Sequence, residues 1–315
     1  MTIELDPHAR EIMSRVWPKY TAAVPRHGDP VDVYRAERDA YVREINRSDA
    51  VVGGVEPITI PGPAGNIPLR LYRPVGVGGG VLPVVMYLHG GGWTVGGGDA
   101  LDGTYRAYCA ATGCLLAVPD YRLAPEHKFP AAVEDCWATA LWLARNASSI
   151  GSDPDLIAIA GESSGGNLAA VVSALAGQGS EVRFRLQCLV YPALDLGADT
   201  PSYRNAVDVF TRDKMHWYIA SYIRGPQDVD DPRASPVRAQ DFAHLPPTAL
   251  VTGGADPLLD EAETYAGKLR AAGVPVDYLR LDGWPHGFAF WPETEAWRQM
   301  MEFVAGALRR ALTRP

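Results

Sequence analysis

The 315-residue sequence has no apolar run long enough to cross a membrane, which takes about 18 residues or more. It also has no run of five like charges, and 37 acidic residues outnumber 29 basic ones, for a net charge of −8. Proteins that bind nucleic acids usually present a basic field. We therefore expect neither a membrane span nor a nucleic-acid partner.

Cysteine is scarce. Its four positions are Cys109, Cys114, Cys136 and Cys188, and they form no Cys-x-x-Cys motif and no Cys/His cluster. The first 17 residues carry acids where a secretory signal needs a basic start and an apolar core. We interpret the cysteines as reduced core thiols. The expectation is a cytoplasmic protein with no metal site and no organic cofactor.

The rest of the composition is that of a globular protein rich in turns. Apolar residues make up 47% of the chain, with 32 glycines and 26 prolines, so whole-chain disorder is excluded. This length allows one large α/β domain or two ordinary ones.

The order of predicted elements favours an α/β fold. Residues 1–48 have helical spacing and no strand signal. From about residue 55, short apolar runs alternate with helical patterns, which is typical of a mostly parallel sheet covered by helices on both sides. The predicted strands are 55–60, 69–73, 82–88, 115–119, 156–160, 186–191, 248–251 and 276–281. The predicted helices that separate or follow them are 101–112, 130–147, 164–177, 259–272 and a final one that includes 297–308.

One stretch interrupts this alternation. Between about 195 and 236 there is no good strand, and the spacing predicts a helix that starts near Thr211 and closes at Gly225-Pro226. Insertions of this length between sheet strands often form a lid or a cap.

The most specific motif is the run GESSGG at 161–166. It follows a predicted apolar strand and opens a helix of small residues, as a Gly-x-Ser-x-Gly nucleophile elbow requires. Gly161 and Gly165 would let strand and helix approach closely, while Glu162 precedes the candidate nucleophile, Ser163. The alternative is a glycine-rich loop at a tight crossover.

A second glycine motif, His89-Gly90-Gly91-Gly92-Trp93, directly follows the predicted strand 82–88. Bare backbone N–H groups can converge on one oxygen and so form an oxyanion hole. A phosphate cradle is disfavoured because no Gly-Lys-Ser/Thr follows. We expect His89 to support the loop.

A serine nucleophile needs a base and an acid that orients it. Of the seven histidines, His89 is expected to support the glycine motif, whereas His286 lies in a glycine-containing loop just after the last predicted strand, where open α/β sheets build their sites. Asp256 follows the strand 248–251, although an aspartate there could simply cap the next helix. Asp260 is the fallback, and Asp282 is too close in sequence to His286 to be preferred. The order Ser163, Asp256, His286 is that of α/β-hydrolases.

Together, HGGGW, YRLAPEHKFPAAVED, GESSGG, DPLLD and HGF resemble the hormone-sensitive-lipase-like family of bacterial carboxylesterases, from about residue 55 to the end. The resemblance implies an α/β-hydrolase fold with Ser163 as nucleophile, His286 as base and Asp256 as its partner. It also implies oxyanion donors from the backbone of Gly91, Gly92 and Ser164. The family usually has Asp-Ser-Ala inside the elbow, where this chain has Glu-Ser-Ser, which leaves substrate preference open.

These observations predict a serine carboxylesterase acting on short- to medium-chain esters. We expect a core of residues 49–195 and 231–315, with a helical cap built from 1–48 and 196–230. Candidate acyl-pocket residues are Trp17, Tyr20, Phe210, Met215, Trp217 and Tyr222, although ordinary helix packing accounts for each of them as well. A homodimer is an open expectation. The alternatives are a serine hydrolase for amides, peptides or lactones, and a non-catalytic binder on the same fold.

Overall fold

A central eight-stranded sheet organises the protein. The structure is a computed structural model that describes residues 4–21, 31–76, 80–205 and 211–314. The strands follow the spatial order β1-β2-β4-β3-β5-β6-β7-β8. Their bounds are β1 (Gly54–Gly62), β2 (Gly65–Arg73), β3 (Leu82–Leu88), β4 (Leu115–Pro119), β5 (Ser152–Glu162), β6 (Phe184–Val190), β7 (Thr248–Gly253) and β8 (Val276–Leu281).

Most neighbouring strands run parallel, as predicted. The exceptions are the antiparallel pairs β1–β2 and β2–β4, whereas the pairs from β4 through β3 to β8 are parallel. The predicted α/β-hydrolase fold with a mostly parallel eight-stranded sheet is confirmed. Parallel strands align their carboxyl ends at one edge of the sheet, and the loops that carry the predicted site residues leave from that edge.

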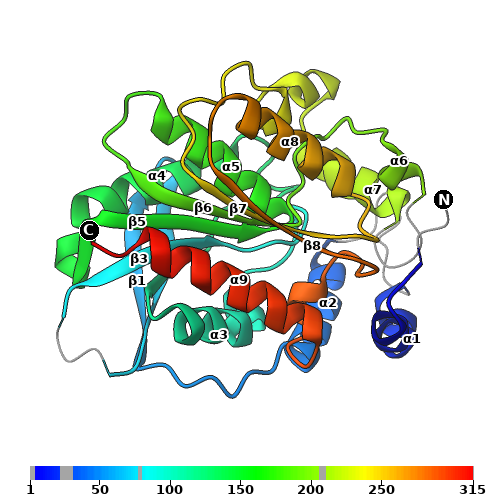
Figure 1. The fold of residues 1–315 in the computed structure, drawn as a ribbon, viewed down its shortest axis with the longest axis horizontal. Helices are drawn as coiled ribbons and strands as arrows, with labels where there is room; N and C mark the ends of the chain where they lie inside the picture. Colours follow the sequence, from blue (N-terminus) through cyan, green and yellow to red (C-terminus); the bar gives the residue numbers. More distant parts are fainter. Residues whose placement is uncertain (1–3, 22–30, 77–79, 206–210, 315) are drawn as a thin grey trace.

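Helices cover both faces of this sheet. Figure 1 shows α3 and α9 on one side and α4, α5 and α8 on the other. Successive residues of β3 belong to opposite cores, since Val84 and Met86 pack into one cluster and Val85 and Tyr87 into the other. The helices are α1 (Pro7–Thr21), α2 (Val31–Ile45), α3 (Asp102–Thr112), α4 (Ala131–Asn146), α5 (Ser164–Gly177), α6 (Pro201–Arg204), α7 (Arg212–Tyr222), α8 (Leu259–Ala271) and α9 (Glu295–Ala311).

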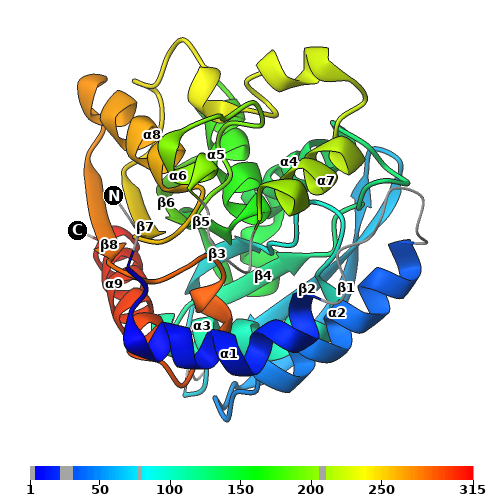
Figure 2. The ribbon, with the colours of Figure 1, turned by 90° about the vertical axis from the view of Figure 1, so that its right-hand side faces the viewer.

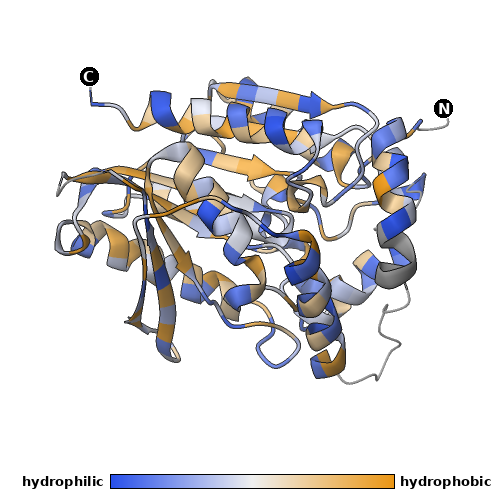
Figure 3. Cartoon of the chain, turned by 90° about the horizontal axis from the view of Figure 1, so that it is seen from below, coloured by the Kyte–Doolittle hydropathy of each residue, from blue (hydrophilic) through white to orange (hydrophobic). Residues whose placement is uncertain are grey.

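Polar and apolar residues are distributed as this layering requires. In Figure 3 the helices are banded by hydrophilic and hydrophobic residues, whereas the central strands are mostly hydrophobic. Strands buried on both faces lose the polar alternation of half-exposed strands. Among the described helices, none is both long and apolar enough to cross a membrane.

The helices that lie outside this layered arrangement come from two separate parts of the sequence. Figure 2 shows α1 and α2 along one side of the sheet edge, and α6 and α7 across from them. The two groups meet where the hydroxyls of Tyr34 in α2 and Tyr218 in α7 lie 2.5 Å apart. Segments 184 residues apart in sequence are thus in direct contact.

A close backbone contact joins the end of α2 to α3. A Cβ atom added at Gly103, in the first turn of α3, would lie 1.8 Å from the carbonyl oxygen of Asn46. The side-chain amide of Asn46 also donates to the hydroxyl of Thr104, at 2.5 Å. Only glycine at position 103 permits this approach, because a backbone carbonyl cannot rotate aside as a side chain can.

We predict that Gly103→Ala lowers the free energy of unfolding by about 1–3 kcal/mol, the usual cost of overpacking. Gly267→Ala is the matched control, because Gly267 is exposed in α8 and a Cβ there meets nothing within 4 Å. That change should stabilise the protein by about 0.5–1 kcal/mol, since alanine favours the helix. Urea unfolding of both variants measures the difference. An unchanged midpoint for Gly103→Ala would contradict the described contact.

Candidate active site

The serine of the GESSGG motif lies in a strained turn between strand and helix. β5 ends at Glu162 and α5 begins at Ser164, so Ser163 is the single residue between them, with φ 54° and ψ −121°. Such a conformation is costly for a residue with a side chain and persists only where its surroundings enforce it. The turn places Ser163 at the amino end of α5, where the helix dipole favours negative charge.

Two glycines make this turn sterically possible. A Cβ at Gly161 would lie 2.3 Å from the carbonyl oxygen of Gly165. A Cβ at Gly165 would lie 2.0 Å from the carbonyl oxygen of Leu88, at the end of β3. The glycines predicted from the motif therefore allow α5 to pack directly on β5 and on the beginning of the second glycine motif.

The structure brings Ser163, His286 and Asp256 together in one chain of hydrogen bonds. His286 Nε2 lies 3.0 Å from Ser163 Oγ, and its Nδ1 lies 2.8 Å from Asp256 Oδ2. A carboxylate only accepts, so Nδ1 carries the proton and Nε2 is left to accept one from the serine. All three residues are buried, with Asp256 only 1% exposed and His286 9% exposed.

The alternative acids have other partners. Asp260 Oδ2 accepts a hydrogen bond from the backbone N–H of Ser202, at 2.8 Å, which fixes α6 to α8. Asp282 pairs with Arg280 at 2.8 Å, and its side chain is 86% exposed. Asp256 also accepts from the N–H of Leu258 through its second oxygen, so it caps a turn and orients His286 at once. The capping alternative and the predicted role are thus compatible.

The second glycine motif forms a loop beside Ser163, and its backbone adopts conformations that favour glycine. The φ angle is 125° at Gly91 and 58° at Gly92. The N–H of Gly90 donates to Glu162 Oε1 at 2.7 Å and is therefore not available to a substrate. Within the described part of the chain, we find no acceptor for the N–H groups of Gly91 and Gly92.

Hydrogen bonds to neighbouring carbonyls fix the direction of these N–H groups. His89 Nδ1 lies 2.9 Å from the oxygen of Gly90, which shares a peptide plane with the Gly91 N–H. The oxygen of Gly91, in the plane of the Gly92 N–H, accepts from the N–H groups of Thr94 and Val95 at 3.1 and 3.0 Å. Burial lowers the pKa of His89 to about 4, which favours the neutral ring. His89 thus supports the loop, as the sequence suggested.

Glu162 connects the nucleophile elbow to the glycine loop through its buried carboxyl group. Its carboxyl group is fully buried and accepts from the Gly90 N–H and from the hydroxyl of Tyr87. Burial raises the pKa of Glu162 to about 7. The residue next to the serine in sequence therefore holds the neighbouring loop, a contact that the motif alone did not reveal.

Other site residues carried no recognisable signal in the sequence. The ring of Tyr218 covers Gly92 so closely that an added Cβ would lie 2.2 Å from Tyr218 Cδ1. The ring of Tyr191 packs on the imidazole of His286, with centroids 4.5 Å apart. Arg35 in α2 donates to the carbonyl of Thr94 at 2.8 Å. These contacts depend on tertiary structure, so only the helical spacing around Tyr218 was visible beforehand.

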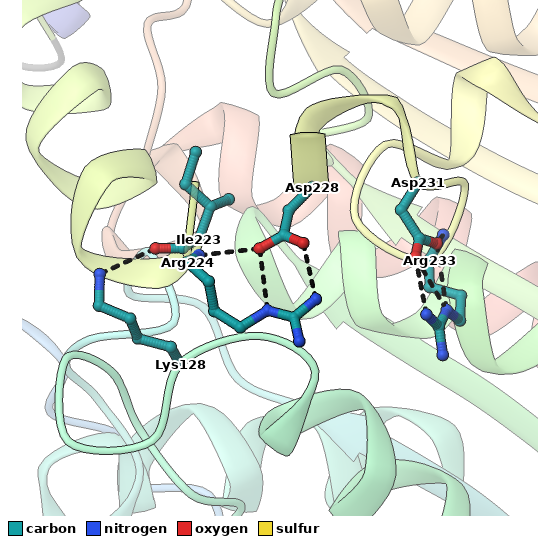
Figure 4. Close-up of polar contacts among 6 residues, drawn as sticks. All are labelled: Lys128, Ile223, Arg224, Asp228, Asp231 and Arg233. Carbon is teal, nitrogen blue, oxygen red and sulfur yellow. Dashed lines mark hydrogen bonds and ion pairs between the residues drawn. The ribbon is translucent and has the colours of Figure 1, made fainter. Parts of the chain in front are cut away.

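The carboxyl end of α7 is fixed to the segment that follows β4. Lys128 donates to the carbonyl oxygen of Ile223 at 2.8 Å (Figure 4). It also donates to the carbonyl oxygen of Ala220 at 2.9 Å, and a cation at a helix carboxyl end satisfies such carbonyls. Just beyond, Asp228 pairs with Arg224 at 2.7 Å. The N–H of Phe129 also donates to the oxygen of Tyr222 at 2.8 Å. α7 is therefore held in place above the glycine loop.

Three of the candidate acyl-pocket residues can be located. Met215 and Tyr222 are buried, and the ring of Tyr222 stacks on Trp93 with centroids 4.4 Å apart. The ring of Trp217 packs edge-on against Tyr34, with centroids 5.3 Å apart. One of these contacts is with the glycine loop and the other is packing between α7 and α2, so the part of these residues in an acyl pocket stays a prediction. Phe210 and the side chains of Trp17 and Tyr20 lie outside the described residues.

Comparison with known proteins bears directly on this geometry. The profile of a family described as alpha/beta hydrolase fold matches residues 85–290, which hold both glycine motifs, Ser163, Asp256 and His286. The chain belongs to this family. The resemblance to hormone-sensitive-lipase-like carboxylesterases is confirmed.

Similar proteins are named as esterases. The chain is 44% identical to the carboxylic ester hydrolase LipN of Mycobacterium tuberculosis, over 74% of this chain but only 64% of that relative, which is less than two thirds of its length. It is 38% identical to the carboxylesterase NlhH of the same species, over 71% of each chain. A solved hyperthermophilic esterase of Pyrobaculum calidifontis is 37% identical, with a TM-score of 0.90 over 98% of this chain and 99% of that one.

Among the described residues, no group of three or more His, Cys, Asp or Glu side chains is placed to hold a metal ion. The four cysteines are buried and unpaired with one another.

We predict that the raised pKa of Glu162 makes folding stability depend on pH. The unfolded carboxyl ionises near its ordinary pKa of 4.5 and the folded one near 7. The contribution of Glu162 to the free energy of unfolding is therefore fully present below pH 4.5 and is lost as pH rises to 7. The total loss is about 3 kcal/mol. Denaturant unfolding across this range should show a loss larger by that amount in the wild type than in Glu162→Gln, in which other groups such as the buried Glu261 still titrate.

The exposed Glu302 provides the control, because Glu302→Gln leaves the buried carboxyl in place and should keep the wild-type pH dependence. Parallel stability curves for wild type and Glu162→Gln would show that Glu162 does not titrate in this range.

Proposed function

We propose that this protein is a serine carboxylesterase that hydrolyses short- to medium-chain carboxylic esters through an acyl-enzyme. The observation that carries the proposal is the hydrogen-bonded chain from Ser163 Oγ through His286 to Asp256, beside two N–H groups of the glycine loop. Relatives named as carboxylic ester hydrolase and carboxylesterase support the same reaction.

In the first half of the proposed reaction, Ser163 Oγ attacks the ester carbonyl carbon while His286 Nε2 accepts the hydroxyl proton. The carbonyl double bond opens, and its oxygen becomes an oxyanion. Asp256 keeps the imidazole in the required tautomer and stabilises the positive charge that it gains. When the tetrahedral intermediate collapses, His286 returns the proton to the alkoxide that leaves, and an alcohol departs.

The second half repeats these steps with water. His286 takes a proton from a water molecule as its oxygen attacks the acyl carbon bonded to Ser163 Oγ. The bond from the acyl carbon to the serine then breaks, the proton returns to Ser163, and a carboxylic acid leaves. Because His286 alternates between base and acid, the site ends the cycle in its starting state.

The oxyanion donors in this proposal are the N–H groups of Gly91, Gly92 and Ser164. Ser164 is the first residue of α5, and the first N–H groups of a helix have no partner within it. The donors are oriented before the reaction begins, so they stabilise developing charge without rearranging. Removal of one such donor typically costs about 10²–10³ in kcat.

We also propose the division into core and cap expected from the sequence, with 1–48 and 196–230 as the cap. The contact of Tyr218 with Gly92 and its hydrogen bond with Tyr34 support it, because both segments reach the glycine loop. Excluding water there would strengthen the electrostatic effect of the donors. A cytoplasmic location is supported by the buried thiols, and a homodimer stays a prediction that light scattering can measure.

Ser163→Ala should lower the rate of p-nitrophenyl ester hydrolysis by at least about 10³-fold while the protein stays folded. Ser173→Ala is the control, because Ser173 is also buried but lies within α5, ten residues after Ser163, and it should keep wild-type activity. A series of acyl-chain lengths, with amides and lactones in parallel, defines the substrate class. A Ser163→Ala variant with more than about a tenth of the wild-type rate would disprove the assignment.

A further inference from the structure

Thr94 controls the orientation of the glycine loop. Its N–H donates to the oxygen of Gly91 at 3.1 Å, and its hydroxyl donates to the oxygen of Gly92 at 2.9 Å. The oxygen of Gly91 and the N–H of Gly92 belong to one peptide plane, which is rigid. The position of Thr94, together with the N–H of Val95 that donates to the same oxygen at 3.0 Å, therefore fixes the direction in which the Gly92 N–H points.

Arg35 holds Thr94 from the N-terminal helix α2. Its Nε donates to the Thr94 oxygen at 2.8 Å, and its Nη2 donates to the Ala124 oxygen, also at 2.8 Å. The N–H of Ala124 in turn donates to the oxygen of Trp93 at 2.8 Å. One guanidinium group thus joins the glycine loop to the segment after β4, through the carbonyl of Thr94 and the carbonyl of Ala124.

Glu126 fixes the orientation of this guanidinium group. Its two oxygens accept from Nη1 and Nη2 of Arg35, each at 2.7 Å, in the planar bidentate arrangement that arginine favours. The hydrogen bond from Arg35 lowers the pKa of the Glu126 carboxyl. Because the side chain of Arg35 is only 21% exposed, water replaces these bonds poorly.

We propose that Arg35 is a positioning residue for the reaction and acts through Thr94 to aim the Gly92 N–H at the oxyanion. The inference rests on the proposed esterase function and extends it, since it gives a residue of the expected cap a part in catalysis. This role of Arg35 differs from that of a residue that only attaches α2 to the core. An anchor would shape the pocket and affect substrate binding, whereas an aimed donor acts on charge that is present only in the transition state.

Measurements of kcat and KM distinguish the positioning role of Arg35 from the anchoring role. For Arg35→Met we expect kcat to fall by about 10- to 100-fold, less than the loss of a whole oxyanion donor, with KM within about threefold of wild type. Glu126→Gln should show a smaller loss of the same kind, and Arg35→Lys should be intermediate, since lysine cannot bridge both carbonyls and the carboxylate. Arg43→Met is the control, because Arg43 is exposed on the same helix.

A second measurement needs no activity. Hydrogen exchange followed by mass spectrometry should show the amides of Thr94 and Val95 exchanging at least about tenfold faster in Arg35→Met than in wild type. Peptides from β5 and α5 should be unchanged. If Arg35→Met does not fold, Glu126→Gln carries the same comparison, because Glu126 is half-exposed and its loss removes only the orienting partner.

The outcomes are distinct. A fall in kcat together with faster exchange in residues 89–98 supports the proposal. A rise in KM at constant kcat, or exchange equal to that of wild type, overturns it. A wild-type protein that hydrolyses no ester would disprove the proposed function, and the exchange data would still decide whether Arg35 orders the loop.

Discussion

The close approach of three backbone segments is the constraint on which the site depends. The helix that begins after Ser163 packs against the end of β3, where a Cβ on Gly165 would lie 2.0 Å from the oxygen of Leu88. A Cβ on Gly90 would likewise lie 2.8 Å from the oxygen of Glu162. Without side chains at these points, the nucleophile elbow and the glycine loop can share one location, and the strained φ of Ser163 is enforced by its neighbours.

Two buried ionisable groups hold the glycine loop by hydrogen bonds. Burial raises the pKa of Glu162 to about 7 and lowers that of His89 to about 4, so both shifts favour the uncharged side chain. Each group forms a hydrogen bond with a backbone atom of Gly90, one with its N–H and the other with its oxygen. The loop is thus oriented by dipoles that need not reorganise when an oxyanion develops, which is the condition for electrostatic catalysis.

The sequence predicted those features that depend on neighbouring residues in the chain. Apolar runs and glycine-flanked turns identified the strands, the elbow and the positions of Asp256 and His286. The helix expected between Thr211 and Gly225-Pro226 is α7, which has Thr211 as its N-cap and ends at Tyr222, just before that Gly-Pro pair. Arg35 and Tyr218 escaped prediction because a charged or aromatic residue on a helix has the same local pattern whether it faces solvent or a distant loop.

The central claim is that Ser163 becomes acylated during turnover. Its most direct test is to quench the reaction with p-nitrophenyl butyrate in acid within the first turnovers and to analyse the peptides by mass spectrometry. The account predicts a butyryl group on the peptide that contains Ser163, at a level that rises with the burst of p-nitrophenol. A butyryl group on another residue, or steady turnover with no acylated peptide, would contradict it.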